Sequence, residues 1–245
     1  MQLDLMEGQD HEDVDDGSRS AGVVRVTMEN DVVPVTGAGS GIGRGEARAF
    51  YEAGARVVLA DVDLSAVTAV AEELGENALA IRLDVTDKAE WTSALAVVEE
   101  RWGVVTVLVN NAGIFRGALL TEQDVEGWRR IFDINLVGHL LGIQAVHRGM
   151  KRNGGGVIIN TSSTAGMGPA PDLSAYGASK WAIRGLTRTA AVEPADGNIR
   201  VKVMVPGIIA TPAAKATGFP DVVPGQPITA IGQPRDIATG SGFEL

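Results

Sequence analysis

The chain has 245 residues, 45% of them apolar and 21% charged, which is enough apolar material for a buried core and excludes a disordered or fibrous protein. A formal net charge of −10 argues against binding to nucleic acid or to an anionic membrane, and the lack of cysteine excludes disulfides, thiolate zinc sites and iron–sulfur clusters. Glycine accounts for 31 of the 245 residues, well above the usual ~7%. The positions of these glycines are therefore informative.

The N-terminal segment is strongly acidic. Its first 20 residues contain seven acidic residues and a single basic one, Arg19. Such charge density predicts a disordered extension over residues 1–30, with an interaction tail as the alternative. The segment does not read as a secretory signal, which needs a basic start and an apolar core, and no apolar run approaches the ~18 residues of a membrane span. We therefore expect a cytoplasmic protein that binds neither membranes nor nucleic acid.

Strands and helices alternate from Asp31 onward. Short β-branched runs predict strands at residues 32–36, 56–60, 79–83, 104–109, 156–160 and 199–205, and apolar residues three and four apart predict helices at 42–53, 64–74, 88–101, 122–150 and 174–192. The strands are apolar on both faces, as in a parallel sheet covered on each side. We expect one α/β domain over residues 31–245, with a Rossmann-type, doubly wound parallel sheet in three α/β/α layers.

The first expected strand runs into the glycine-rich turn Thr36–Gly43. Glycines let this backbone turn tightly and approach a pyrophosphate, and the following helix N-terminus offers free N–H groups to that anion. The second strand ends in Asp61, 18 residues past Gly43, where a carboxylate can bind both ribose hydroxyls and repel a 2′-phosphate. The pattern favours NAD(H) as cofactor, while Arg44 and Arg56 nearby keep NADP(H) possible.

The spacing Thr-Gly-x-x-x-Gly-x-Gly resembles the turn of the short-chain dehydrogenase/reductase family, and further motifs follow in that family's order. They are Asp84-Val85, Asn110-Asn111-Ala112-Gly113, Asn135 in the long helix, Ser163 after the fifth strand, Tyr176-Gly-Ala-Ser-Lys180, and Pro206-Gly207 with Ile209 and Thr211. The resemblance extends over residues 31–238. It implies cofactor contacts from Gly37, Ser40, Gly41, Ile42, Gly43, Asp61, Asp84, Val85, Asn111, Ala112, Gly113, Tyr176, Lys180, Pro206, Gly207, Ile209 and Thr211.

Tyr176 and Lys180 are four residues apart, so both project from one face of a helix. An ammonium group and the positive nicotinamide ring would favour the phenolate of Tyr176, which could then take the proton of a secondary alcohol. Ser163 would hold the substrate oxygen, with Ser162 as the competing serine. By resemblance, Asn135 supports a water linked to Lys180. No set of residues has the spacing of a metal site, so we expect none.

The substrate is predicted only as an apolar secondary alcohol or ketone. Residues 176–186 and the Ala-Asp-Val-Asp at the second strand are similar to bacterial hydroxysteroid dehydrogenases of the 3α/20β type. The family also implies a lid, here at about residues 207–231, and assembly into dimers or tetramers. Met167, Leu173 and Met204 are the candidates for lining an apolar pocket.

Three departures from the family pattern carry expectations of their own. Pro34 falls inside the first strand, where a missing N–H predicts a bulge or a lost hydrogen bond. Residues 19–30 replace the usual lead-in. The residues after Ala238 do not match the family's last helix and strand, so we expect that strand, and an oligomer interface, to be absent. An inactive protein that binds a dinucleotide without turnover therefore stands as the alternative to an active dehydrogenase.

Overall fold

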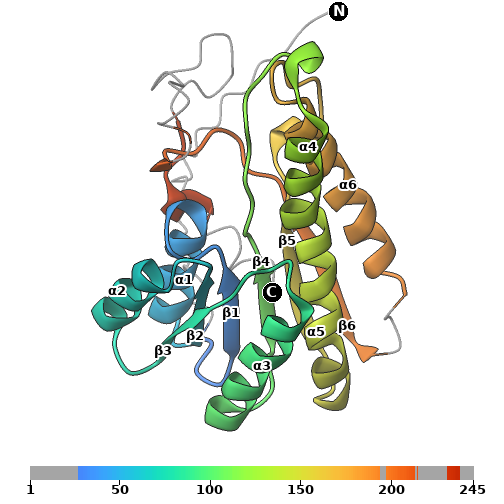
Figure 1. Cartoon of the computed structure of the whole chain (residues 1–245). Helices are drawn as coiled ribbons and strands as arrows, with labels where there is room; N and C mark the ends of the chain where they lie inside the picture. The colour runs from blue at the N-terminus through green and yellow to red at the C-terminus, as the bar shows by residue number, and fades with distance from the viewer. Residues whose placement is uncertain (1–26, 194–196, 213, 215–230, 238–245) are drawn as a thin grey trace, which may run out of the picture.

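A computed structural model describes residues 27–193, 197–212, 214 and 231–237 (Figure 1). The expectations about the acidic tail up to residue 26, the interior of the lid segment and a missing last strand after Ala238 lie outside these residues. Among the described residues, no helix is both long enough and apolar enough to cross a membrane.

The described strands form one six-stranded parallel sheet in the order β3-β2-β1-β4-β5-β6. Their bounds are β1 Val32–Thr36, β2 Arg56–Asp61, β3 Ala78–Arg82, β4 Val107–Asn110, β5 Gly156–Thr161 and β6 Ile199–Met204. The strand order reverses between β1 and β4, which opens a crevice at the carboxyl ends of these two strands. The predicted Rossmann-type sheet is confirmed.

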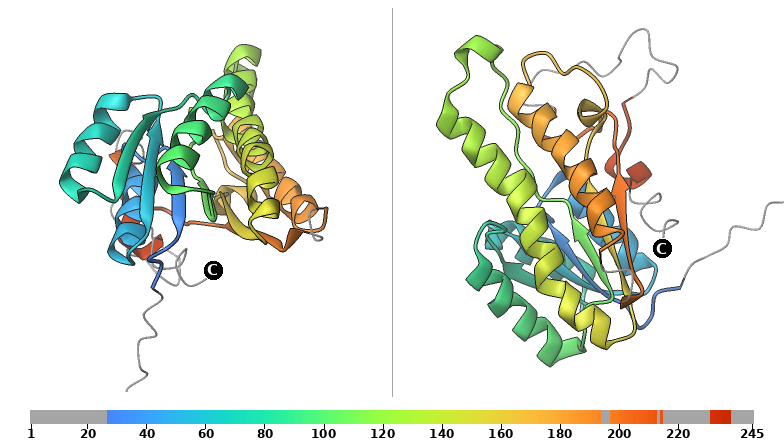
Figure 2. Two further views of the ribbon diagram at one scale, coloured as in Figure 1. Left: turned by 90° about the horizontal axis from the view of Figure 1, so that it is seen from below. Right: turned by 90° about the vertical axis from the view of Figure 1, so that its right-hand side faces the viewer.

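Helices cover both faces of this sheet, as Figure 2 shows from two sides. On one face lie α1 (Gly41–Glu52) and α2 (Leu64–Leu74), whose Phe50 and Val67 share a buried cluster with Val35 of β1. On the other face lie α3 (Lys88–Trp102), α5 (Gly138–Arg152) and α6 (Ser174–Ala190), which share a second cluster with Leu108 and Ile158. The three expected layers are therefore present.

The predicted single helix over residues 122–150 is divided into four pieces. A short 3-10 turn, η1 (Leu120–Glu122), precedes α4 (Val125–Phe132), and a π turn, η2 (Asp133–Val137), joins α4 to α5. In the π turn the N–H of Gly138 donates to the carbonyl of Asp133, five residues back. Because such a turn inserts one extra residue, it redirects the side chains that it carries. The buried residue of this turn is Asn135.

Pro34 lies in β1 without a bulge toward β2. All five residues of β1 pair in register with β2, whereas the pairing of β1 with β4 has the single register pair Val35↔Val109. Pro34 has no N–H to give β4, and alternate residues of a parallel strand bond to the same neighbour. The Thr106 hydroxyl instead accepts from the N–H of Val32 at 3.0 Å and donates to Asp31 at 2.7 Å. The expected strand at 104–109 accordingly begins only at Val107.

Two further contacts bear on the expected boundaries. Met28 is buried in the core beside α1, and its N–H donates to the carbonyl of Ala53 at 2.9 Å. The packed part of the chain therefore begins before residue 31. Where the lid is predicted, the N–H of Ala210 donates to the carbonyl of Gly232 at 2.8 Å, and the N–H of Gly232 donates to the carbonyl of Ile208 at 3.1 Å. These bonds join Ile208 and Ala210 to Gly232.

Candidate active site

A cavity of about 370 Å³ opens at the carboxyl ends of β1, β2, β4 and β5. Most of the residues that the sequence singles out line it: Gly37, Ser40, Gly41, Ile42, Asp61, Asp84, Val85, Asn111, Ala112, Gly113, Ser163, Tyr176, Lys180, Pro206, Gly207 and Thr211. Three do not line it. Gly43, Asn135 and Ile209 are buried and are not among its lining residues.

The glycine-rich turn has the geometry of a phosphate cradle. Gly37 and Gly41 have φ angles of +67° and +57°, which disfavour any residue with a side chain. A Cβ on Gly43 would stand 2.5 Å from the carbonyl of Gly37 and 2.4 Å from the Asn111 amide nitrogen. Helix α1 begins at Gly41, so its free N–H groups point toward the cavity mouth. These residues fit the pyrophosphate of a dinucleotide.

Asp61 is held by backbone donors at the end of β2. Its carboxylate accepts from the N–H of Gly39 at 3.0 Å and from the N–H of Asp63 at 3.1 Å. The two arginines that could favour a 2′-phosphate are engaged elsewhere. Arg44 pairs with Glu73 of α2 at 3.2 Å, and Arg56 bonds the Trp102 carbonyl at 3.4 Å from the opposite end of β2. Among the described residues, no cation is paired with the Asp61 carboxylate, which lines the cavity.

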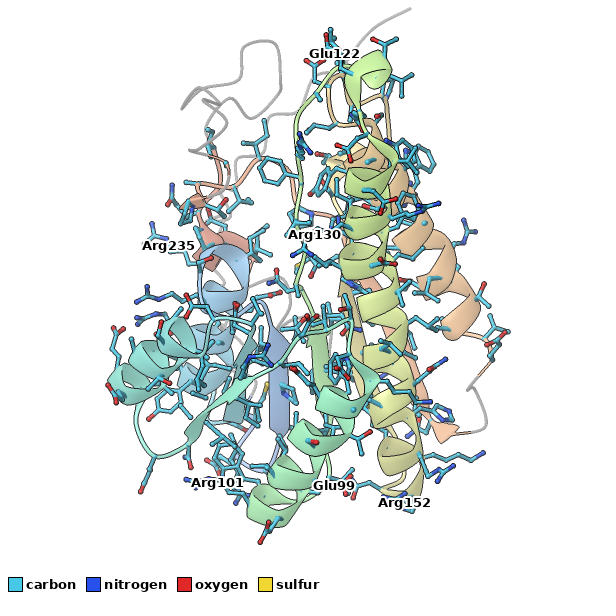
Figure 3. The ribbon with its side chains drawn as sticks, in the orientation of Figure 1. Glu99, Arg101, Glu122, Arg130, Arg152 and Arg235 are labelled. Atoms are coloured by element: carbon cyan, nitrogen blue, oxygen red, sulfur yellow. The ribbon has the colours of Figure 1, made fainter. Side chains whose placement is uncertain are left out.

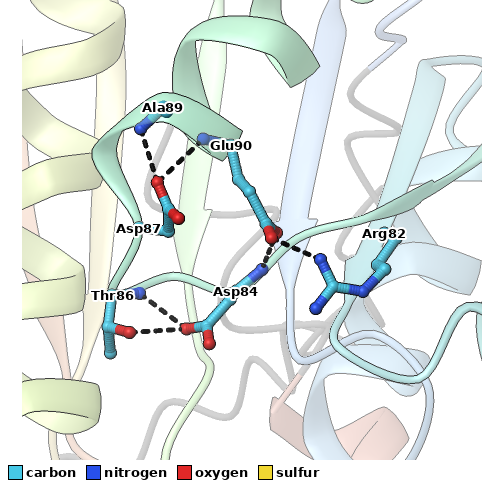
Figure 4. A network of polar contacts seen from close by, with 6 residues as sticks. All are labelled: Arg82, Asp84, Thr86, Asp87, Ala89 and Glu90. Carbon is cyan, nitrogen blue, oxygen red and sulfur yellow. Dashed lines mark hydrogen bonds and ion pairs between the residues drawn. The ribbon is translucent and has the colours of Figure 1, made fainter.

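The loop after β3 holds Asp84 at the next position along the cavity (Figure 4). Thr86 donates to the Asp84 carboxylate from its hydroxyl at 2.7 Å and from its N–H at 2.9 Å, and the hydroxyl bond is the largest cause of a lowered Asp84 pKa. The N–H of Asp84 donates to Glu90 at 2.7 Å, while Glu90 pairs with Arg82. The indole N–H of Trp91 donates to the Val85 carbonyl at 3.0 Å. Helix α3 therefore fixes the backbone of Asp84 and Val85, both predicted cofactor contacts.

Asn111 joins β1 to β4 beside the turn. Its amide donates to the carbonyl of Thr36 at 2.9 Å, and the Thr36 hydroxyl accepts from the N–H groups of Asn111 and Ala112, each at 3.0 Å. These bonds bridge the two strands where the ladder is short because of Pro34. Asn111 thus supports the structure and lines the cavity at the same time.

Ser163, Tyr176 and Lys180 meet in the cavity from β5 and α6. The Nζ of Lys180 lies 5.5 Å from the centre of the Tyr176 ring and donates to the Thr161 carbonyl at 2.8 Å. Burial raises the pKa of Tyr176, and a hydrogen bond with Ser163 opposes that rise. Burial also lowers the pKa of Lys180 to about 7. The pKa of Tyr176 is thus raised, whereas the charges of Lys180 and of a nicotinamide ring were expected to favour the phenolate.

Comparison with known proteins agrees with this arrangement. Residues 31–219 match the family described as short chain dehydrogenase. The chain belongs to this family.

Two relatives and one solved structure show the extent of the similarity. The 2,5-dichloro-2,5-cyclohexadiene-1,4-diol dehydrogenase LinX of Sphingobium indicum is 39% identical, with 88% of this chain and 89% of that protein covered. The 3-alpha-(or 20-beta)-hydroxysteroid dehydrogenase of Mycobacterium tuberculosis is 41% identical over 74% of this chain and 70% of that protein. A 7 alpha-hydroxysteroid dehydrogenase complexed with NADH and 7-oxo glycochenodeoxycholic acid superimposes with a TM-score of 0.82 at 33% identity, covering 89% and 88% of the two chains. The chain is thus an oxidoreductase acting on alcohol or ketone groups.

Several residues of this short-chain dehydrogenase's cavity were not singled out from the sequence. Phe115 packs edge-on against Tyr176, with ring centres 5.7 Å apart, and Ile114 lies beside it. Arg130 reaches the cavity from α4, as Figure 3 shows. The candidates Met167, Leu173 and Met204 are not among the described residues that line this cavity, and their role in an apolar pocket stays a prediction. The signal in the sequence that could have identified Phe115 as a cavity residue was its position, two residues after Gly113.

A second hollow of about 300 Å³ lies at the amino ends of β4 and β5 and contains none of the predicted site residues. At the same end, Glu99 of α3 and Arg152 of α5 are 4.0 Å apart and exposed (Figure 3). Among the described residues, no group of His, Asp and Glu could hold a metal ion.

Proposed function

We propose that this protein is an NAD(H)-dependent dehydrogenase that interconverts a secondary alcohol and a ketone, with Tyr176 as general acid and base. The observation that carries the proposal is that Ser163, Tyr176 and Lys180 line the same cavity as the glycine-rich turn and Asp61. One cavity would then hold both the dinucleotide and the reacting group.

The preference for NAD(H) follows from Asp61. Its carboxylate would accept hydrogen bonds from the two ribose hydroxyls, and its charge would repel a 2′-phosphate. Arg44 is paired with Glu73 and so does not compensate that repulsion. The pyrophosphate would bind at Ser40–Ile42, the adenine beside Asp84 and Val85, and the nicotinamide end near Gly113, Pro206–Gly207, Ile209 and Thr211.

The proposed mechanism needs three side chains at the substrate oxygen. Ser163 holds the hydroxyl of the alcohol, and the Tyr176 phenolate takes its proton while the C–O bond becomes a carbonyl. Lys180, as an ammonium, stabilises the phenolate and would also bind the nicotinamide ribose. A nicotinamide held near Gly113, Pro206–Gly207, Ile209 and Thr211 would supply the hydride acceptor for oxidation of the alcohol and the hydride donor for reduction of the ketone. Asn135 supports the wall next to Lys180.

We propose an alicyclic secondary alcohol as the substrate class. LinX is named for a ring diol and the 7 alpha-hydroxysteroid dehydrogenase for a ring alcohol, and Phe115 and Ile114 give the cavity an apolar wall next to Tyr176. A flat apolar ring can pack against Phe115 while its hydroxyl reaches Ser163. A hydroxysteroid is the larger member of this class, and cyclohexanol is the smaller.

The test is a panel of cyclohexanol, a 3α- and a 20β-hydroxysteroid and a linear secondary alcohol, each with NAD⁺ and with NADP⁺. Tyr176→Phe should lose at least ~10²-fold in kcat while still binding NADH, because only the proton transfer is removed. Tyr51→Phe, which changes the chain's only other tyrosine, is the matched control and should keep its activity. Full activity of Tyr176→Phe would refute the mechanism.

The same experiment separates the alternative. A wild-type protein that binds NADH but turns over none of these alcohols or ketones would favour a dinucleotide-binding protein without catalysis. Cytoplasmic location and assembly into dimers or tetramers stay predictions, and sizing of the purified protein tests the second.

A further inference from the structure

Ser163 of the proposed site stands at the start of a short 3-10 turn, η3 (Thr164–Gly166), which follows β5. Its Oγ accepts from the N–H of Ala165 at 3.2 Å, and its carbonyl accepts from the N–H of Gly166 at 2.8 Å. The direction of the Ser163 hydroxyl therefore depends on where this turn lies. So short a turn has few hydrogen bonds of its own, and the elements that it contacts must hold it in place.

The turn lies directly against the backbone of α6. A Cβ on Gly166 would stand 2.7 Å from the carbonyl carbon of Lys180 and 2.8 Å from its carbonyl oxygen. At the other end of the turn, the N–H of Thr164 donates to the carbonyl of Pro206 at 2.9 Å, in the loop after β6. Helix α6 and this loop thus hold η3 from two sides.

Arg184 bonds the end of the turn from one face of α6. It follows Lys180 by four residues and Tyr176 by eight, so the three side chains lie on the same side of the helix. Its guanidinium donates to the carbonyl of Gly166 at 2.7 Å. Because the donor is charged, the bond is stronger than one between neutral groups. It joins the turn that begins at Ser163 to the helix that carries the proposed acid and base.

The indole of Trp181 holds the guanidinium of Arg184 in place. The guanidinium carbon lies over the ring, 5.2 Å from its centre, which is within the range of an attractive cation–π contact. Trp181 is 50% exposed, so a large part of this side chain is not used in the core. A guanidinium that already lies against a ring loses less freedom when it bonds the Gly166 carbonyl.

We propose that Arg184 is a positioning residue, which holds the Ser163 hydroxyl in line with Tyr176 through the η3 turn. Ser163 reaches the cavity from β5, whereas Tyr176 comes from α6, so their alignment depends on how the turn is seated on the helix. A misplacement of about 1 Å can lower a rate by ~10²-fold. The inference rests on the proposed function, which assigns Ser163 to the substrate oxygen.

The test is a double-mutant cycle of Arg184→Met and Ser163→Ala, with residual kcat followed by NADH absorbance at high enzyme concentration. Arg184→Met keeps an apolar stem without a donor, and it should lower kcat about tenfold in the wild-type background but less than about twofold in Ser163→Ala. The Kd for NADH should stay the same. Arg184→Lys, which keeps a charged donor, should retain more activity than Arg184→Met. Arg188→Met, one turn further along α6 and exposed, is the matched control and should keep the wild-type kcat.

A wild-type kcat in folded Arg184→Met would overturn the proposal. An equal fold-loss in both backgrounds would also overturn it, because a general loss of structure does not depend on Ser163. If Arg184→Met does not fold, Arg184→Gln, with a shorter neutral side chain, takes its place in the cycle.

Amide hydrogen exchange without substrate separates this inference from the proposed function. The N–H of Gly166 should exchange at least about tenfold faster in Arg184→Met, when compared with the N–H of Val157 in β5, because the turn is no longer held. An unchanged exchange rate at Gly166 would overturn the role of Arg184 even in a protein without turnover. A protein that oxidises no alcohol but shows the faster exchange would refute the proposed function alone.

Discussion

Asn135 holds both backbone polar groups of Ile114. Its Oδ1 accepts from the Ile114 N–H at 2.8 Å, and its amide donates to the Ile114 carbonyl at 2.9 Å and to the Ser179 hydroxyl at 3.0 Å. The π turn aims Asn135 at this loop, and the loop carries Phe115 against Tyr176. The asparagine therefore connects helix geometry to the wall of the active site.

Asn135→Ala should loosen this loop. We expect an unfolding free energy lower by about 2 kcal/mol, since buried groups lose their partners, and a kcat lower by about tenfold, since the wall beside Tyr176 is no longer held. Urea unfolding and steady-state kinetics measure the two effects. Asn153→Ala, at the exposed end of α5, should leave kcat unchanged. A kcat equal to wild type in Asn135→Ala would contradict the positioning role.

Cofactor preference should respond to Asp61 and to the pair Arg44–Glu73. Asp61→Ser removes the charge that would repel a 2′-phosphate, and Glu73→Gln releases Arg44 to approach it. The double variant should raise the ratio of kcat/KM for NADPH over NADH by at least about tenfold, or ~1.4 kcal/mol. Asp61→Ser with Glu72→Gln, the exposed neighbour, is the matched control and should show a smaller gain. A wild-type preference for NADPH would refute the ribose argument.

Stability should depend on pH through Lys180. Burial lowers its pKa from the ordinary 10.5 to about 7, so between pH 7 and 10.5 the unfolded chain binds more protons at this group than the folded chain. The contribution of Lys180 to the unfolding free energy therefore rises with pH over that range. Below pH 7 the folded protein carries the full cost of burying the charged amine. Lys180→Met should be more stable than wild type at pH 6.5, by an amount that shrinks toward pH 9.5.

Urea unfolding at four pH values between 6.5 and 9.5 tests this linkage. All four pH values lie below the ordinary tyrosine pKa of ~10. Lys88→Met, at an exposed position of α3, is the control for the loss of a lysine. A constant difference between Lys180→Met and wild type would show that burial does not perturb the lysine.

Two glycine substitutions should affect different properties: one weakens NADH binding, and the other stabilises the fold. Gly43→Ala would place a methyl group 2.5 Å from the Gly37 carbonyl, so the phosphate-facing turn must shift, and the Kd for NADH should rise at least about tenfold. Gly185→Ala in α6 meets no atom within 4 Å and should raise the unfolding free energy by ~1 kcal/mol because alanine favours helix. Fluorescence titration measures the Kd of Gly43→Ala for NADH, and urea unfolding measures the stability of Gly185→Ala. Unchanged NADH affinity in Gly43→Ala would exclude the proposed cradle.

Patterns of neighbouring residues predicted much of this fold. The β-branched runs located five strands to within one residue at each end, because parallel strands buried on both faces need apolar residues throughout. The fourth strand is the exception. Pro34 cannot donate to it and Thr106 takes over part of the pairing, so β4 starts at Val107.

Some residues of the candidate site could likewise be predicted from the sequence, and others could not. Gly41, Asp61 and Tyr176 could be placed from the sequence because each stands at the end of a strand or on a helix face that opens at the sheet's carboxyl edge. Phe115 and Arg130 could not, since they reach the cavity through the path of a loop and of α4. The hydrogen bond from the Trp91 indole to the Val85 carbonyl likewise joins a helix side chain to the end of a strand. No local sequence pattern relates these two residues.

The sequence by itself determined the order of strands and helices, the glycine-rich turn and the identity of the polar residues at the strand ends, all of which depend on neighbours in the chain. Only the tertiary structure decided the π turn that aims Asn135, the engagement of Arg44 by Glu73 and the protonation balance of Tyr176 and Lys180. The physical reason is burial. A pKa depends on how much water and charge surround a group, and these are set by residues far apart in the chain.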